Sequence, residues 1–349
     1  MDPHELEQRL AQFIAHQLGV GSVTIANLRR LPGGASRETW SLDVSCEHDG
    51  KRISMPLVLR RDLPTRPAQT SRRDEFLLLQ AAHADGVPVP KVHWLGDDAE
   101  TLGAPFFLME RVEGETIARR LLRDEAYAQA RQVMTAQLGR ILARIHRIDR
   151  GKHGLDSLIE PPPETTPAEG ELDRYEQIFR FIAPEPHPAF ELAIRWLLRQ
   201  MPHRGEPRGG EPRGSERVVV HGDYRIGNVI FGPEGVRAIL DWELAHVGDP
   251  MEDLGWICVR SWRFGSDEKP VGGIGMREEF FRAYEESGGG KVDPERVRFW
   301  EVLGNLKWAI ICIMQAKSHL DGHVHSVELA SLGRRTAEME LELLNLIAG

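Results

Sequence analysis

The stretch HGDYRIGN at residues 221–228, followed by ILDW at residues 239–242, decides which fold to expect for this chain. The apolar runs on either side of the turn sequence GPEG, residues 232–235, predict a β-hairpin between the two motifs. The run VVV at residues 218–220 predicts a short buried strand before the first motif. This order of strand, loop, hairpin and strand end predicts that the polar side chains of both motifs converge on one site.

Three of these side chains suit the transfer of a phosphoryl group to a hydroxyl. Asp223 can accept the proton of the attacking hydroxyl and orient it in line with the leaving oxygen. Asn228 and Asp241 offer the oxygen ligands that Mg²⁺ prefers, and Mg²⁺ bridges the charged oxygens of ATP. Taken alone, the triplet HGD is equally compatible with a turn in which Asp223 caps its own backbone. The full combination favours phosphoryl transfer.

The two motifs resemble the catalytic core of the aminoglycoside phosphotransferase-like family of small-molecule kinases, which also includes choline kinase-like members. The sequence LDWELAHVGDPMEDLGW, residues 240–256, is most similar to the branch found as kinase-like domains beside acyl-CoA dehydrogenases. The resemblance implies that Asp223 is the catalytic residue, that Asn228 and Asp241 bind the metal, and that ATP and Mg²⁺ are the cofactors.

The same resemblance implies that two further acids, Asp249 and Asp253, brace the loop after the metal-binding aspartate. Ordinary capping of the helix that follows is an equally good interpretation of both residues.

Composition narrows the class of protein. A chain of 349 residues with 41% hydrophobic residues can hold two lobes. The formal net charge of -9 argues against binding to nucleic acid and is weakly compatible with a cationic substrate. We therefore expect the partner to be a small molecule with a hydroxyl group. The sequence does not specify an oligomeric state.

The three cysteines are widely spaced and form no C-x-x-C pair, so they indicate neither disulfides nor a zinc site. The amino terminus lacks the pattern of a signal peptide, and the longest apolar stretch, residues 308–314, is too short to span a bilayer. We expect a cytoplasmic protein with no membrane segment.

Periodicity predicts an α+β chain with a change of character near residue 112. Before it, a helix (residues 6–18), strands and a further helix (71–84) alternate, and the strands are predicted at residues 23–31, 39–45, 52–60 and 106–112. After residue 115 the pattern is mainly helical, with helices predicted at residues 124–148, 172–182, 188–201, 276–287, 294–319 and 326–347. With the resemblance, this predicts a bilobal protein-kinase-like fold with a β-rich nucleotide-binding lobe (residues 1–111) and a mostly helical catalytic and substrate lobe (residues 112–349).

The predicted nucleotide site begins in the sequence GGASRET, residues 33–39, where Gly34 and Ser36 could bring backbone amides and a hydroxyl to the phosphates. A plain hairpin turn is the alternative. Arg60 stands where kinases usually carry a phosphate-binding lysine, and Glu75 is its candidate ion-pair partner. A solvated charge on a helix is the competing interpretation of Glu75.

Residues 106–112, with the sequence FFLMERV, match the family's strand and hinge between lobes. Backbone groups around Glu110 and Val112 are therefore expected to bind the adenine edge. His146 resembles a family helix position, and we interpret it as a hydrogen-bonded core histidine.

The acceptor site is the least defined part. Gln315 and His319 are candidates because they lie near a predicted helix break at residues 321–322. The cluster of His319, Asp321, His323 and His325 could alternatively bind zinc or be a solvated loop. The segment 204–214 contains GEPRG twice and is predicted to be a surface excursion.

Three functions remain open from the sequence. The first is an ATP- and Mg²⁺-dependent kinase of a small hydroxylated compound, either a hydroxyacyl or hydroxy-acid compound, as the branch suggests, or an aminoglycoside or choline-like amino alcohol. The second is a nucleotide-binding regulatory pseudokinase, for which Arg60 leaves room. The third, a protein kinase, is disfavoured because no APE-like segment follows Asp241.

Overall fold

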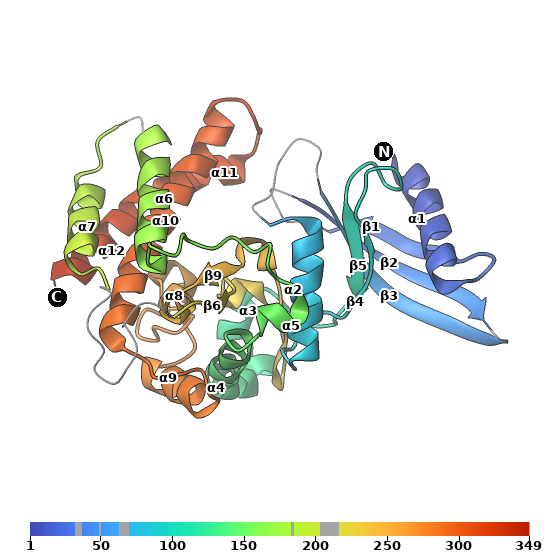
Figure 1. Ribbon diagram of the computed structural model, residues 1–349, viewed down its shortest axis with the longest axis horizontal. Helices are drawn as coiled ribbons and strands as arrows, with labels where there is room; N and C mark the ends of the chain where they lie inside the picture. Colours follow the sequence, from blue (N-terminus) through green and yellow to red (C-terminus); the bar gives the residue numbers. More distant parts are fainter. Residues whose placement is uncertain (32–36, 49, 63–69, 183–184, 203–215, 349) are drawn as a thin grey trace.

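The computed structural model describes residues 1–31, 37–48, 50–62, 70–182, 185–202 and 216–348. The glycine-rich segment with Gly34 and Ser36, and the GEPRG repeats, lie outside these residues. The described chain forms two lobes, with a sheet at one end of the molecule and packed helices at the other (Figure 1). The predicted α+β bilobal fold is confirmed.

The amino-terminal lobe is a five-stranded antiparallel sheet in the order β1-β2-β3-β5-β4. Its elements are α1 (Pro3–Leu18), β1 (Thr24–Arg30), β2 (Arg37–His48), β3 (Lys51–Asp62), α2 (Arg72–Ala84), β4 (Val92–Gly96) and β5 (Phe106–Glu110). Leu6, Leu10 and Ile14 recur at helical spacing on α1 and pack against the sheet. Leu78 and Leu79 of α2 belong to the main core together with β3 and β5. The sheet is thus covered by α1 and α2, and α2 lies toward the second lobe.

The carboxyl-terminal lobe is built around the long helix α10 (Pro294–Leu320), most of whose residues up to Ile313 are buried. The other helices are α3 (Ala118–Arg123), α4 (Ala128–Ile145), α5 (Arg150–His153), α6 (Pro167–Ile182), α7 (Pro188–Arg199), α8 (Pro250–Trp256), α9 (Arg277–Glu286), α11 (Val327–Leu332) and α12 (Thr336–Ala348). Short 3₁₀ turns are η1 (Glu125–Tyr127), η2 (Ile226–Asn228), η3 (Trp242–Leu244), η4 (Arg260–Arg263) and η5 (Gly333–Arg335).

Two small antiparallel ladders carry the motif residues. Strand β6 (Val218–Val220) pairs with β9 (His246–Gly248), and β7 (Val229–Gly232) pairs with β8 (Gly235–Ile239) as the predicted hairpin. The hairpin is bonded on both sides. Glu115, in the connection between the lobes, exchanges two backbone hydrogen bonds with Phe231, at 2.9 and 3.0 Å. The amide of Ile239 donates to the carbonyl of Pro88, after α2, at 2.8 Å.

Some element predictions are wrong in detail. The helix predicted at residues 326–347 is divided into α11, η5 and α12, and the helix predicted from residue 124 begins as the 3₁₀ turn η1. Strands β4 and β9 and helix α3 were not predicted. Strand β4 is an edge strand with mostly intermediate burial, so its apolar alternation is weak, and β9 is only 3 residues long.

In the described part of the chain, none of the helices is both long and apolar enough to cross a membrane.

Candidate active site

Three side-chain donors hold the carboxylate of Asp223, which lies in the loop at residues 221–228, here called the catalytic loop. The indole nitrogen Nε1 of Trp256 and Nε of Arg225 donate to Oδ1 at 2.8 and 2.9 Å. The amide nitrogen of Asn228 donates to Oδ2 at 2.6 Å. Asp223 is 9% exposed, so it sits in a mostly closed site but still reaches the surface. Its two oxygens therefore have different partners.

The backbone of the catalytic loop is fixed by Asp253, which comes from α8. The amides of His221 and Gly222 donate to its two carboxylate oxygens at 2.7 and 2.9 Å. Gly222 has a φ of +76°, and a Cβ there would lie 2.4 Å from the carbonyl oxygen of Leu244, so only glycine fits. The loop shape is thus specified by one glycine and one buried acid.

Asp253 is kept ionised in this position. Burial alone would raise its pKa, but hydrogen bonding and charge from His146, together with His221, outweigh burial and lower the pKa. His146 bonds Asp253 through Nε2 at 3.1 Å and the hydroxyl of Tyr284 through Nδ1 at 2.8 Å. His146 is therefore the buried, hydrogen-bonded core histidine that its position indicated.

Asp249, the other acid that the resemblance assigned to bracing, has a different place. It caps α8 by accepting from the amide of Met251 at 2.8 Å, and it pairs with Arg296 at 2.7 Å. Of the two acids, only Asp253 bonds the catalytic loop.

His221 is neutral and supports Asp223. Burial lowers its pKa. Nε2 donates to the carbonyl oxygen of Leu240 at 3.0 Å, and Nδ1 accepts from the amide of Asp223 at 3.2 Å, which together define one tautomer.

Asn228 precedes β7 and Asp241 follows β8, so both lie at the open end of the hairpin. The side-chain amide nitrogen of Asn228 also donates to the backbone carbonyl oxygen of Asp223 at 3.0 Å, so the side-chain amide oxygen of Asn228 points away from Asp223. Asp241 has a φ of +67° and a side chain that is 34% exposed. An amide oxygen and a carboxylate beside a half-open site are hard donors that fit Mg²⁺.

A second group of charges connects the lobes, here called the interlobe ion group: Arg60, Arg72, Glu75 and Asp241. The terminal nitrogens of Arg60 lie 2.9 Å from Glu75 and 3.2 Å from Asp241. Arg72 reaches Glu75 at 2.5 Å and Asp62 at 2.9 Å. Glu75 is completely buried, so its interpretation as a solvated helix charge is wrong.

Arg60 also sets the charge state of Asp241. Burial alone would raise the pKa of Asp241, but the Arg60 guanidinium outweighs burial and lowers the pKa. The carboxylate of Asp241 is therefore ionised near neutral pH.

The hinge residues lie at the end of β5 and just after it, and β5 is an inner strand of the sheet. The amide of Glu110 already donates to the carbonyl of Lys91 at 2.8 Å, and the amide of Arg111 donates to Pro56 at 3.0 Å. Among the described residues, Val112 has no such bond from its amide, and it lines a cavity of about 530 Å³ beside β1 and β2. Val112 therefore remains the better candidate of the two for backbone recognition.

Gln315 and His319 lie near the end of α10. His319 accepts from the amide of Ser326 through Nδ1 at 3.1 Å, which shapes the turn into α11. In the described part of the chain, no hydrogen bond or ion pair joins either residue to the catalytic loop. The zinc alternative is not supported, since the one group of possible metal ligands among the described residues lies elsewhere.

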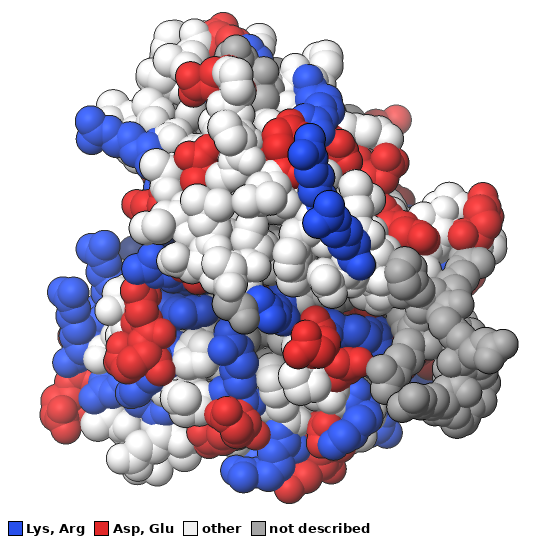
Figure 2. All heavy atoms as spheres, turned by 90° about the vertical axis from the view of Figure 1, so that its left-hand side faces the viewer, with Lys and Arg blue, Asp and Glu red and all other residues white. Residues whose placement is uncertain are grey.

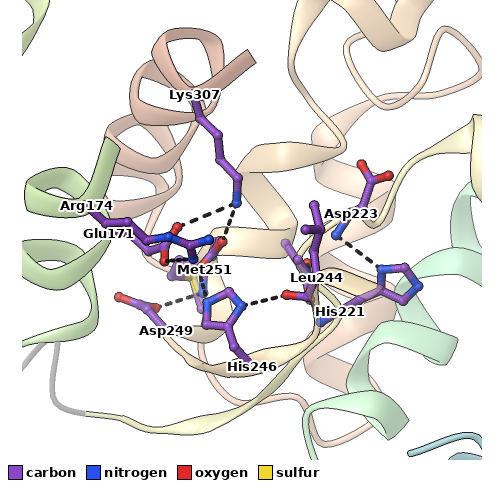
Figure 3. A network of polar contacts seen from close by, with 12 residues as sticks. Glu171, Arg174, His221, Asp223, Leu244, His246, Asp249, Met251 and Lys307 are labelled. Atoms are coloured by element: carbon purple, nitrogen blue, oxygen red, sulfur yellow. Dashed lines mark hydrogen bonds and ion pairs between the residues drawn. The ribbon is translucent and has the colours of Figure 1, made fainter. Parts of the chain in front are cut away.

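That other group is a buried quartet of Glu171, His246, Glu252 and Lys307. Possible ligand atoms of the two glutamates and the histidine lie within 4.8 Å of one another. The ammonium of Lys307 points into this group from α10, 3.3 Å from Glu252 and 3.6 Å from Glu171 (Figure 3). Lysine already supplies the cation, so the quartet is an internal ion network.

Sequence reasoning missed Trp256 and Arg225, the two residues that hold Oδ1 of Asp223. Asp253 and Trp256 are three positions apart on one helix, so both reach the same loop from α8. That spacing within the DLGW sequence is the signal that could have found Trp256. Arg225 also stacks on the ring of Trp262, with 4.7 Å between its guanidinium carbon and the ring centroid.

A cavity of about 760 Å³ lies next to this aromatic group, between α3, η4 and α12. Ser261 lines it, and the neighbouring Trp262 contacts Trp256 with 5.4 Å between ring centroids. Its charged lining side chains are Arg119, Arg260, Asp267, Arg335 and Glu338. Through Ser261, the cavity adjoins in sequence the residue Trp262 that stacks with Arg225.

The fold is that of a bilobal, kinase-like phosphotransferase. A model of the phosphotransferase enzyme family called APH matches residues 27–300. The chain belongs to this family and is a small-molecule kinase.

The curated relatives are longer proteins. The chain is 27% identical over 347 residues to acyl-CoA dehydrogenase family member 10 of Mus musculus, and the match covers 95% of this chain but 30% of the relative. It is 25% identical over 253 residues to acyl-CoA dehydrogenase family member 11 of Homo sapiens, with 71% of this chain and 29% of the relative covered. The chain thus spans less than a third of the length of these relatives, and the predicted resemblance to this branch is confirmed.

Solved structures share the fold. A proposed aminoglycoside phosphotransferase of Ralstonia eutropha has a TM-score of 0.76 and 23% identity, with 98% of each chain covered. A thermostable mutant of the aminoglycoside phosphotransferase APH(4)-Ia, solved as a ternary complex with AMP-PNP and hygromycin B, has a TM-score of 0.60 and 16% identity, with 97% of this chain and 99% of that chain covered.

Proposed function

We propose that this protein transfers the γ-phosphoryl group of ATP, with Mg²⁺, to a hydroxyl of a small anionic compound of the hydroxyacyl or hydroxy-acid class. The observation that carries the proposal is the convergence of Asp223, Asn228 and Asp241 in one half-open site, with Arg60 beside them. This is the set of groups that phosphoryl transfer needs.

In the proposed reaction the hydroxyl oxygen of the acceptor forms a bond to the γ-phosphorus as the bond to the β–γ bridging oxygen breaks. ADP leaves, and the hydroxyl proton passes to a carboxylate oxygen of Asp223. Positioning supplies most of the rate gain in such a reaction. Arg60 lies where it can pair with phosphate oxygens, and Glu75 holds it there at 2.9 Å.

Asn228 and Asp241 are the residues that would hold Mg²⁺. When bound, the ion neutralises the charge on the phosphate oxygens. Until nucleotide arrives, Arg60 pairs with Asp241 at 3.2 Å and keeps that carboxylate from being an unpaired charge.

The cavity beside Trp262 favours an anionic acceptor over a cationic one. Its lining contains three arginines, two acids and the apolar side chains of Ile117, Phe264 and Met339. Arg260 is paired with Asp267 at 2.7 Å, and Arg335 with Glu338 at 3.3 Å. Arg119 is exposed and has no ion-pair partner in the described part of the chain, which leaves it able to bind a carboxylate or phosphate. An aminoglycoside or choline-like amino alcohol would instead need a predominantly acidic wall.

The face of the helical lobe in Figure 2 also fits a small-molecule partner. Basic and acidic side chains lie next to one another over the lower half of this face, unlike the predominantly basic surface that binds nucleic acid.

A regulatory pseudokinase is the second candidate, since Arg60 replaces the usual lysine. The complete set of Asp223, Asn228 and Asp241 argues against it, because a protein that only binds nucleotide does not need an oriented carboxylate at the acceptor side.

Release of ADP from ATP, with and without Mg²⁺, tests the reaction. We expect turnover that requires Mg²⁺, and a loss of about 10³-fold or more in Asp223→Ala with MgADP binding retained. Asp97→Ala is the matched control, because Asp97 pairs with Arg73 on the surface. Unchanged turnover in Asp223→Ala would refute the assignment.

The acceptor class is tested by mass spectrometry of a set of hydroxylated compounds: 3-hydroxybutyryl-CoA, 3-hydroxybutyrate, kanamycin and choline. We expect ATP-dependent addition of phosphate to the anionic compounds. Arg119→Ala should raise the KM of the accepted anion about 10-fold without changing the KM of ATP. Arg123→Ala, on the same helix but outside the cavity lining, is the control. Phosphorylation of kanamycin or choline alone would show that the protein accepts cationic rather than anionic compounds.

A further inference from the structure

We infer that Trp256 is a positioning residue of the catalytic base: its indole N–H fixes Oδ1 of Asp223, with Lys307 behind the ring, so that Oδ2 is the oxygen turned to the acceptor hydroxyl. This inference rests on the proposed function.

The first support is that the two oxygens of the Asp223 carboxylate accept from different donors. Oδ1 accepts from the indole of Trp256 at 2.8 Å and from Arg225 at 2.9 Å, whereas Oδ2 accepts only from the amide of Asn228 among the described residues. Trp256 is 3% exposed, while the side chain of Arg225 is 25% exposed. The indole is thus the buried donor with the least freedom to move.

The second support is how firmly the indole itself is held. Gly255 lets α8 approach α10 so closely that a Cβ there would lie 2.7 Å from the Cβ of Trp300. This packing leaves the Trp256 ring against the side chains of α10. The ring also contacts Trp262, with 5.4 Å between ring centroids. A ring packed in this way keeps its N–H aimed at one point.

The third support is the cation on the ring face. The ammonium of Lys307 lies 5.1 Å from the Trp256 centroid and 5.2 Å from that of Tyr175. A cation over the face of an indole draws on its π electrons, so the N–H hydrogen becomes more positive and a better donor. Burial alone would lower the pKa of Lys307, but Tyr175, Glu252 and Glu171 outweigh burial and raise it, so the cation persists.

These contacts form one chain of interactions from the buried quartet to the base. Lys307 is held by the carboxylates of the quartet, it contacts the ring of Trp256, and Trp256 contacts Asp223. The quartet therefore has a consequence for the reaction although none of its members touches the acceptor.

Trp256→Phe tests the inference, because it removes the N–H and keeps most of the packing. Trp300→Phe is the matched control: Trp300 is also 3% exposed, and in the described part of the chain its indole nitrogen has no hydrogen-bond partner. The assays are ATP hydrolysis with water as acceptor and phosphoryl transfer to 3-hydroxybutyryl-CoA.

In Trp256→Phe we expect kcat to fall about 10- to 100-fold while the KM of ATP stays within about 2-fold, because the acceptor side alone loses orientation. Trp300→Phe should change kcat by less than about 2-fold. Equal kcat values in the two variants would overturn the inference. An inactive wild-type protein would instead overturn the proposed function and the positioning role together.

The hydrogen bond can also be read without turnover. In a ¹⁵N–¹H spectrum of the 8 tryptophans, the indole signal lost in Trp256→Phe should move strongly in Asp223→Asn, and the Trp300 signal should stay. An unmoved Trp256 signal would contradict the contact. Lys307→Met should lower kcat about 3- to 10-fold and move the same signal, whereas Lys307→Arg should retain both values near those of the wild type. A folded Lys307→Met variant with wild-type kcat would show that Lys307 does not strengthen the Trp256 N–H donor.

Discussion

The interlobe ion group and the buried quartet contain the same kinds of side chains, yet only one of them is open on one side. In the interlobe group the Asp241 side chain is 34% exposed. In the quartet every side chain is at most 10% exposed, and each carboxylate already has a cation. Solvent access, rather than the number of acids, distinguishes the proposed metal and nucleotide site from an internal network that stabilises the lobe.

The largest effect is expected from a substitution in the interlobe ion group. Asp241→Asn should lower kcat about 10³-fold, because a neutral amide is a poorer Mg²⁺ ligand and a charge is lost beside the phosphates. The measurement is ADP release over a Mg²⁺ titration. Asp97→Asn, on the surface, should behave as wild type, and more than a tenth of wild-type kcat in Asp241→Asn would exclude a metal-binding role.

A substitution in the buried quartet should instead change the stability of the protein. Glu252→Gln should reduce the free energy of unfolding by about 3–5 kcal/mol, since it leaves buried cations with one carboxylate fewer. Urea unfolding measures this change. Glu176→Gln, which loses only the half-exposed pair with Arg180, should cost less than about 1 kcal/mol. Equal costs for both changes would mean that burial of the quartet does not matter.

A smaller effect should follow from pH. Burial alone would lower the pKa of His246, but the Glu252 carboxylate outweighs burial and raises it to about 9. Both ring nitrogens face acceptors, Leu244 and Glu252, and Glu171 and Lys307 are the other charged neighbours. Because the folded-state pKa is above the unfolded one, this stabilisation is complete below about pH 6.5 and is lost as the pH rises through about 9.

The unfolding free energy should therefore fall by an amount on the order of 3 kcal/mol between pH 6 and pH 10. Urea unfolding of the wild type and of His246→Gln over this range checks the direction. A wild-type curve parallel to that of His246→Gln would show that His246 is not the group responsible.

The smallest effect sharpens the comparison. Arg60 spans Glu75 and Asp241 with its two terminal nitrogens, which a lysine with one nitrogen does less well. Arg60→Lys should raise the KM of ATP about 3- to 10-fold and change kcat less. Arg73→Lys, paired with Asp97 on the surface, is the control. An increase in activity would show that arginine is a handicap at this position.

The sequence predicted the class of fold and the convergence of the motif residues because both depend on local order. The residue before the first strand of a hairpin and the residue after its second strand are neighbours, so the hairpin brings Asn228 and Asp241 together wherever it is placed in a protein. The partners of Asp223 were harder to predict. Trp256 lies 33 residues further along the chain and reaches Asp223 only because α8 packs on the catalytic loop.

The burial of Glu75 was likewise not predicted from the sequence. Its spacing on an amphipathic helix indicates a surface charge for Glu75, whereas the folded chain buries it completely and pairs it with Arg60 from β3 and Arg72 from its own helix. The proposed acceptor cavity joins α3, η4 and α12, segments more than 60 residues apart, so no local pattern indicated it.

The hairpin of β7 and β8 has a mechanical consequence. It is bonded to the connection between the lobes at Glu115 and to the segment after α2 at Pro88. Rocking of the sheet against the helices would have its fulcrum at this hairpin, where displacement is smallest, while the far rim of the sheet would travel most. A nucleotide could then enter and leave at the rim while Asn228 and Asp241 keep their spacing.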